Sequence, residues 1–202
     1  MKTKALFHTI LRSLFVASLL LHDLLMAQAK TYTVRQEDSH IGFAVYKWAV
    51  FKEEGRFKDF SGAIVYDPKN PSTSRVEFTV QARSIDSRNT DRDRALRSRD
   101  FFHVERYPTL AFKSTQVAAR GSDSLLVTGD LTLRGVTKRL TIPVKVLGLN
   151  RVSEIGELAG FEATFVVNRE DFGIARDWKI ISKEATIHLM IGAVSNLQNA
   201  GL

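Results

Sequence analysis

The chain has 202 residues, of which 44% are hydrophobic and 25% are charged, and its formal net charge is +7. These values exclude a disordered or fibrous protein and are typical of one globular domain that buries a real core. The sequence contains no cysteine, which excludes disulfide bonds, a thiolate nucleophile and a cysteine-based metal site.

The first 29 residues have the pattern of a secretory signal peptide. Three basic residues precede or flank an apolar run from Leu14 to Leu21, and Ala27-Gln28-Ala29 supplies a small-x-small cleavage pattern. The run is broken at His22, which makes it short for a bilayer span of roughly 20 residues and favours cleavage over a retained anchor. We therefore predict cleavage after Ala29, one domain over residues 30–202, and a periplasmic or secreted location. Residues 1–29 carry a net charge of +2, so the remaining 173 residues carry +5.

Apolar and polar residues alternate along most of the remaining chain, which is the pattern of β-strands. The predicted strands cover residues 32–36, 41–46, 56–66, 76–81, 110–113, 127–133, 140–146, 161–167 and 187–191. Because successive side chains on a strand point to opposite faces, each run has one apolar face, which indicates antiparallel strands around a single interior. The segment from Leu131 to Val144, with its turn around Gly135, gives the strongest hairpin signal.

Eight or nine strands in this length form either a β-sandwich or a closed barrel. The sequential, hairpin-like spacing favours the barrel, and we predict an all-β fold with an antiparallel, up-and-down, eight-stranded barrel. A barrel of eight strands is just wide enough to hold one small ligand. Periodicity alone does not distinguish a hollow interior from a filled one.

The segment from Ser87 to Phe102 is crowded with Arg and Asp instead of alternating. We predict one short helix over residues 90–99, with Asn89 or Thr90 as its N-cap and the following Phe101 and Phe102 packed back onto the domain. The interleaved Asp residues favour a solvated helix face with local ion pairs over an anion site. The guanidinium fork of Arg nevertheless matches phosphate oxygens well, so an anionic head group near this helix stays an alternative.

The sequence carries no recognisable catalytic or nucleotide-binding motif. The three histidines after the predicted cleavage site lie far apart, so we expect no metal site. Asp38-Ser39-His40 cannot act as a catalytic triad, because adjacent side chains diverge. A lipid-modifying enzyme that uses His40 or the carboxylates of Asp91, Asp93 and Asp100 is the least favoured alternative, because nothing in the sequence pairs these groups.

Five short motifs follow one another along the chain. They are Asp38-Ser39-His40-Ile41-Gly42-Phe43; Gly55-Arg56-Phe57 with Phe60 and Gly62; Leu96-x-Ser98-x-Asp100-Phe101-Phe102; Gly129-Asp130-Leu131-Thr132-Leu133-Arg134-Gly135-Val136-Thr137; and Arg169-x-x-Phe172-Gly173. In this order they resemble the signature of the YceI-like, polyisoprenoid-binding family, over about Tyr32 to Val194. The resemblance implies a lipocalin-like barrel of eight antiparallel strands with a helix at one end, and a long apolar cavity.

The same resemblance implies a non-catalytic protein that binds, stores or transports a long-chain isoprenoid or a similar amphiphilic lipid, such as an isoprenoid quinone or a polyprenyl phosphate. The alternative is a structural or stress-related envelope protein with a filled barrel and no lipid ligand. The residues expected to line a cavity are Phe43, Val45, Phe78, Val80, Phe112, Leu131, Leu133, Ile142, Val144 and Phe165. Arg92 and Arg97 are the candidates for contact with a polar head group.

We expect no metal, no nucleic acid and no cofactor other than a bound isoprenoid lipid or quinone as ligand. A carrier of this kind is expected to contact a membrane surface transiently, and a homodimer is compatible with the sequence.

Overall fold

The computed structural model describes residues 29–152, 156–174 and 180–195. Residues 1–28, which hold nearly all of the predicted signal peptide, lie outside the described residues, so its cleavage stays a prediction. In the described part of the chain, no helix has the length and apolar character needed to cross a bilayer.

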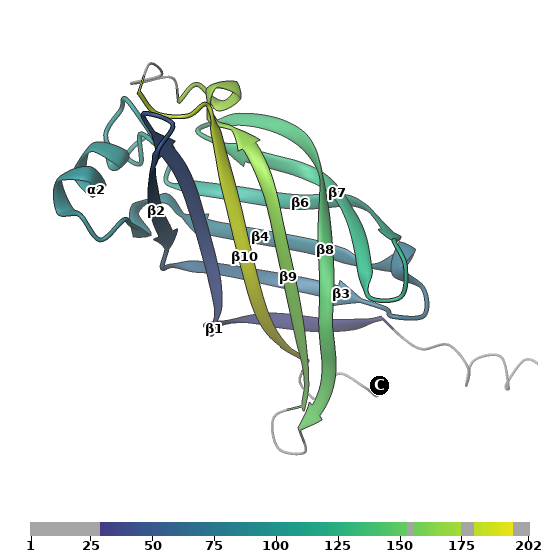
Figure 1. Cartoon of the computed structure of the whole chain (residues 1–202). Coiled ribbons are helices and arrows are strands. Elements are labelled where there is room, and N and C mark those ends of the chain that lie inside the picture. The colour runs from purple at the N-terminus through teal and green to yellow at the C-terminus, as the bar shows by residue number, and fades with distance from the viewer. Residues whose placement is uncertain (1–28, 153–155, 175–179, 196–202) are drawn as a thin grey trace, which may run out of the picture.

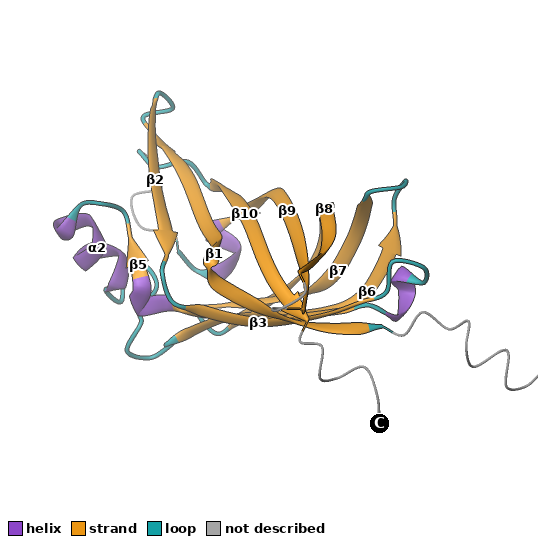
Figure 2. Ribbon diagram, turned by 90° about the horizontal axis from the view of Figure 1, so that it is seen from below, coloured by secondary structure: helices purple, strands orange, loops and turns teal. Residues whose placement is uncertain are grey.

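Strands make up most of the structure (Figures 1 and 2). In chain order they are β1 (Lys30–Lys47), β2 (Phe51–Phe57), β3 (Phe60–Tyr66), β4 (Arg75–Gln81), β5 (Ile85–Asp86), β6 (Thr109–Ala119), β7 (Ser124–Leu133), β8 (Val136–Val152), β9 (Gly156–Asn168) and β10 (Glu184–Ser195). The helices are α2 (Thr90–Arg97) and three short 3-10 turns, η1 (Pro71–Thr73), η2 (Ala82–Ser84) and η3 (Arg169–Phe172).

Eight strands close into a barrel, as predicted. The strand order is β10-β9-β8-β7-β6-β4-β3-β1, and β1 pairs with β10 to complete the ring. All these pairings are antiparallel, and the chain runs up and down through them. The barrel is flattened, because β8, β9, β10 and the second half of β1 cross the other strands steeply (Figure 1).

Strand β1 is one bent strand where the alternation predicted two. Its register against β10 shifts between Arg35 and His40, which marks a bulge, and the strand turns a corner there (Figure 1). Ser39 supplies the hydrogen bonds that the irregular backbone loses: its hydroxyl donates to the Arg35 carbonyl at 2.6 Å and accepts from the Gly192 N–H at 3.0 Å. The sequence prediction of two strands was wrong because the bulge keeps both segments in one ladder.

The predicted strand over residues 56–66 is instead interrupted. Strand β2 pairs with the second half of β1, β3 pairs with its first half, and Lys58 and Asp59 separate the two. Only β3 continues the barrel by pairing with β4. On its outer edge, the described ladder of β2 is limited to Arg56 and Phe57 against β5. The barrel wall is therefore split beside β2, and α2 lies on that side (Figure 1).

The helix α2 begins at Thr90, as predicted, and ends two residues earlier than predicted. Asn89 is its N-cap: the side-chain oxygen accepts from the Arg92 N–H at 2.9 Å. After the helix, Phe102 packs edge-on against Phe57 with 5.7 Å between ring centroids, and Phe101 joins a second apolar cluster around Phe172. The two phenylalanines thus anchor the helical segment to the barrel, as the sequence indicated.

Candidate functional site

A cavity of about 610 Å³ occupies the barrel interior. It is lined mainly by the apolar inward faces of the strands. All ten residues expected from the alternation line it: Phe43, Val45, Phe78, Val80, Phe112, Leu131, Leu133, Ile142, Val144 and Phe165. The volume lies in the range of natural small-molecule pockets. Contact of these ten side chains with a lipid stays a prediction.

The inward side chains are not all packed against one another. Phe43, Phe78 and Phe112 point to the interior and are nevertheless only partly buried, while residues such as Ile142, at 6% exposed, lie deeper in the wall. Inward residues that keep accessible surface are what a hollow barrel requires. The interpretation of a filled barrel is therefore wrong, because the opposite faces of this flattened barrel do not meet along their whole length.

Glycines in the wall make room for the phenylalanine rings. Phe43 is paired with Gly55 across β1 and β2, and a side chain at Gly55 would collide with the tip of the Phe43 ring. Phe78 lies in the same way over Gly62, and the Phe112 ring lies over Gly129. The rings therefore extend sideways over the neighbouring strand. This arrangement keeps three large aromatic groups against the wall and leaves the centre of the barrel open.

The cavity has a polar end beside α2, which we define by Glu53, Ser87 and Arg92. The Arg92 guanidinium forms an ion pair with the Glu53 carboxylate of β2. It also donates to the Ser87 hydroxyl at 2.9 Å and to the Ser87 carbonyl at 2.7 Å. Arg92 is thus a cavity-lining cation, as expected for a head-group contact, but its guanidinium already has protein partners.

Two further carboxylates stand near this end. Glu54 lines the cavity, and the hydrogen bond and charge of Lys52 lower the pKa of its carboxyl group. Asp93 is buried and accepts from the Ser87 N–H at 2.8 Å and from the Ser87 hydroxyl at 2.5 Å. Ser87 is therefore held on both sides, by Asp93 and by Arg92, and fixes the start of α2 against β2.

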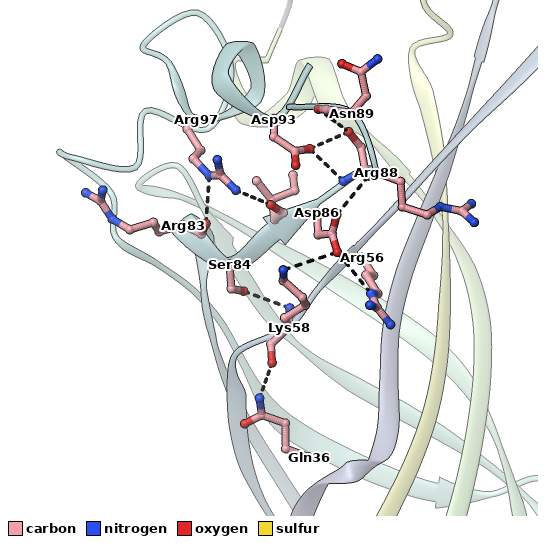
Figure 3. Close-up of polar contacts among 12 residues, drawn as sticks. Gln36, Arg56, Lys58, Arg83, Ser84, Asp86, Arg88, Asn89, Asp93 and Arg97 are labelled. Atoms are coloured by element: carbon pink, nitrogen blue, oxygen red, sulfur yellow. Dashed lines mark hydrogen bonds and ion pairs between the residues drawn. The ribbon is translucent and has the colours of Figure 1, made fainter. Parts of the chain in front are cut away.

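Arg97, the second head-group candidate, is not among the residues that line the cavity. Its guanidinium donates to the backbone carbonyls of Arg83 at 2.9 Å and of Ile85 at 2.6 Å (Figure 3). In the same region Asp86 accepts from the Arg88 N–H at 3.0 Å, and this hydrogen bond, helped by Lys58, lowers the pKa of Asp86. Arg97 therefore links α2 to the η2–β5 segment by hydrogen bonds. Its side chain extends toward backbone carbonyls and not into the barrel.

Two cavity-lining cations, Lys47 and Arg169, were not among the candidates from the sequence. Arg169, in η3, is 7% exposed and donates to the carbonyls of Ser182 at 2.8 Å, Ile174 at 2.5 Å and Ile181 at 3.1 Å. The side chain ties η3 to the segment that precedes β10. Its motif, Arg169-x-x-Phe172-Gly173, was the only signal in the sequence, and nothing in that signal indicated that the charge is buried beside a cavity.

The groups considered for catalysis do not gather in the cavity. Among the described residues, its lining contains neither His40 nor Asp91, Asp93 or Asp100. Asp91 forms an exposed ion pair with Arg94 at 3.0 Å. Over residues 29–152, 156–174 and 180–195, no three His, Asp or Glu side chains are grouped so that they could hold a metal ion.

Comparison with known proteins agrees with this architecture. The family model of the YceI-like domain matches residues 32–193. A UPF0312 protein of Pseudomonas paraeruginosa is 40% identical over 174 residues, which cover 83% of this chain and 88% of the relative. Protein YceI of Escherichia coli O6:H1 is 37% identical with the same coverage.

Solved structures share the fold. The crystal structure of Burkholderia cenocepacia BcnA superposes with a TM-score of 0.74 at 24% identity, over 80% of this chain and 99% of that one. A polyisoprenoid binding domain from Saccharophagus degradans, implicated in plant cell wall breakdown, superposes with a TM-score of 0.65 at 16% identity, over 81% and 98%. The family model and the close relatives, which extend over most of the barrel just described, show that this chain belongs to the YceI-like family.

Proposed function

We propose that the protein binds, stores or carries a long-chain isoprenoid or a similar amphiphilic lipid in the barrel, without catalysing a reaction on it. The observation that carries the proposal is the apolar cavity of about 610 Å³ enclosed by the inward strand faces. The polyisoprenoid binding domain from Saccharophagus degradans, which shares the fold, supports the same class of ligand.

The energetics favour a hydrocarbon ligand. Each methylene group transferred from water to an apolar site contributes about 0.8 kcal/mol, so a few isoprene units supply enough free energy to offset the cost of ordering the chain. The polar end offers a place for a head group, since the guanidinium of Arg92 has five N–H donors and only three of them reach Glu53 and Ser87. The Glu53 and Arg92 charges are paired with each other, which supports binding in preference to acid–base chemistry.

Native mass spectrometry of gently purified protein tests the proposal. We expect an added mass in the range of a prenyl lipid, or uptake of added ubiquinone or polyprenyl phosphate by ligand-free protein. Protein that arrives without ligand and ignores both added lipids would overturn the proposal. Incubation of the loaded protein, followed by analysis of the released lipid, checks the absence of turnover, which would appear as a changed lipid mass.

We further propose that the chain is exported and cleaved after Ala29, leaving residues 30–202 in the periplasm or outside the cell. The intact mass of protein recovered from a periplasmic extract tests this. A mass that includes residues 1–29 would contradict it.

A further inference from the structure

The turn between β1 and β2 exposes a cluster of large apolar side chains. We define residues Tyr46–Lys52 as the aromatic tip. In it Val50 is 71% exposed, Phe51 59%, Trp48 58% and Tyr46 44%. Single exposed apolar residues are common, but a contiguous group marks an interaction site. Of the other large apolar side chains exposed in the described chain, Ile180 lies beside the tip, and Leu147, Val166 and Met190 lie on three different strands.

The backbone of the tip adopts a left-handed conformation that is unfavourable for residues other than glycine. Trp48 and Ala49 have φ angles of 51° and 58°, and the Val50 N–H donates to the Lys47 carbonyl at 3.2 Å, which makes a turn that favours Asn-Gly. A non-glycine residue in this left-handed region costs on the order of 1–3 kcal/mol. The Trp48 ring meets the Phe51 ring edge-on at 6.1 Å, but both stay exposed. Contacts within the described structure therefore do little to offset the backbone cost of an exposed tryptophan at this position.

Basic side chains frame the tip. Lys47 places its ammonium group 4.4 Å from the centre of the Trp48 ring, Lys52 closes the other side, and no acidic residue lies between them. The nearest carboxylates are already paired, Glu53 with Arg92 and Glu54 with Lys52. Aromatic rings flanked by lysines suit the boundary of an anionic bilayer, where the rings enter the head-group layer and the ammonium groups meet phosphates.

The tip is continuous with the polar end of the cavity. The Trp48 N–H donates to the Ile180 carbonyl and the Ser182 N–H donates to the Tyr46 carbonyl, each at 2.7 Å. Ile180 and Lys47 both line the cavity. Figure 2 shows the β1–β2 hairpin standing clear of the neighbouring loops. A surface that received the tip would therefore face this end of the barrel.

We propose that the aromatic tip docks the protein on an anionic phospholipid bilayer, with Trp48, Val50 and Phe51 inserted at head-group depth. The docking goes beyond the proposed cavity ligand and does not need an occupied cavity. Arg92 pairs with Glu53, and Lys52 and Arg88 pair with Glu54. Together with Lys47, these residues carry a net charge of +2, which favours phosphatidylglycerol over phosphatidylcholine.

Sedimentation with vesicles tests the docking. The exported protein is mixed with vesicles of phosphatidylethanolamine and phosphatidylglycerol, or of phosphatidylcholine alone. We expect binding to the anionic vesicles to be at least tenfold tighter and to weaken with salt. The double variant Trp48→Ser/Phe51→Ser should lose at least tenfold of that binding. The matched control Val166→Ser/Met190→Ser removes two exposed apolar side chains elsewhere and should bind as the wild type does.

Two further measurements separate a loss of vesicle binding from a loss of folding and test whether Trp48 enters the bilayer. The variant Trp48→Asn/Ala49→Gly suits the turn, so it should fold at least as stably as the wild type and still lose vesicle binding. In a Trp178→Phe background Trp48 is the single tryptophan, and brominated lipids should quench its fluorescence.

Equal binding by wild type and tip variants, or no quenching, would overturn the proposal. A wild-type dimer that the tip variants lose, without vesicle binding, would assign the tip to a second copy and overturn it as well. None of these readouts uses the cavity ligand, so a failure here is distinct from a failure in native mass spectrometry.

Discussion

The Arg92 guanidinium of α2 forms an ion pair with the Glu53 carboxylate of β2 at the polar end of the cavity. The pair joins the helix to the strand whose outer edge is otherwise laddered only at Arg56 and Phe57. It therefore closes the split in the barrel wall with two side chains, each about one-third exposed. If the proposed ligand has an anionic head group, Glu53 competes with it for Arg92.

Glu53→Gln should therefore tighten the binding of polyprenyl phosphate about fivefold, because it frees one edge of Arg92 at a gain of about 1 kcal/mol. Ubiquinone, which has no charge, should bind this variant as it binds the wild type. Arg92→Gln should weaken polyprenyl phosphate binding and serves as the opposite control. Titration calorimetry with both lipids measures the effect. If Glu53→Gln changed the affinity for both lipids equally, Arg92 would not contact the head group.

Filling the cavity should remove the ligand without unfolding the protein. Val144 lines the cavity and is partly buried, so Val144→Trp should place its ring in open space and change the free energy of unfolding by less than about 1.5 kcal/mol. We expect at least a tenfold loss of bound lipid in native mass spectrometry. Lys145→Trp puts the same side chain on the outer face of β8 and should bind like the wild type. Full lipid binding by Val144→Trp would place the ligand outside the barrel.

The glycines under the phenylalanine rings should differ in their tolerance to alanine. A methyl group at Gly129 would lie 2.6 Å from the Lys113 carbonyl oxygen, which is backbone and cannot move away, so Gly129→Ala should cost roughly 2–3 kcal/mol. A methyl group at Gly55 meets only the tip of the Phe43 ring, which can swing into the cavity. Gly55→Ala should therefore cost about 1 kcal/mol but weaken lipid binding. Urea unfolding and native mass spectrometry measure the two effects, and equal destabilisation would refute the distinction.

Acid should weaken the fold at the contact between β1 and β9. The hydrogen bond from Lys30, at 2.8 Å, and that from Tyr32 lower the pKa of Glu157 below its usual 4.5. Since the folded-state pKa is below the unfolded value, this stabilisation is present above about pH 4.5 and is lost as the pH falls through the folded-state pKa. Glu157→Gln should be roughly 1 kcal/mol less stable than the wild type at pH 7, and the difference should shrink in acid.

At alkaline pH the partner Tyr32 should act in the opposite direction. Burial, followed by the Glu157 contact, raises the pKa of Tyr32 above its usual 10, so stability should fall as the pH rises past 10. Unfolding in urea across the pH range measures both the loss of stability in acid and the loss at alkaline pH. Glu77→Gln, which removes an exposed ion pair with Lys113, is the control and should follow the wild-type pH profile. If Glu157→Gln lost as much stability in acid as the wild type does, Glu157 would not be the cause of the acid-dependent loss.

Much of this arrangement could be predicted from local patterns. The alternation identified which side of each strand faces the interior, because that property depends only on neighbouring residues. It therefore named the cavity-lining side chains, such as Phe43 and Val144, before their partners were known. The Asn89 cap and the Gly135 hairpin were predictable for the same reason, since both depend on bonds within a few residues.

Other features depend on residues that are distant in sequence. Whether residues 30–47 form one strand or two depends on the bulge that Ser39 stabilises against Gly192, and the barrel closes only because β1 meets β10. Arg92 and Arg97 look alike in the sequence, and only the fold directs the first to Glu53 beside the cavity and the second to backbone carbonyls. The alternation of residues was enough to identify the inward faces. That these faces enclose a cavity follows only from the closed barrel, because the size of the interior depends on the distance between strands that come from opposite ends of the chain.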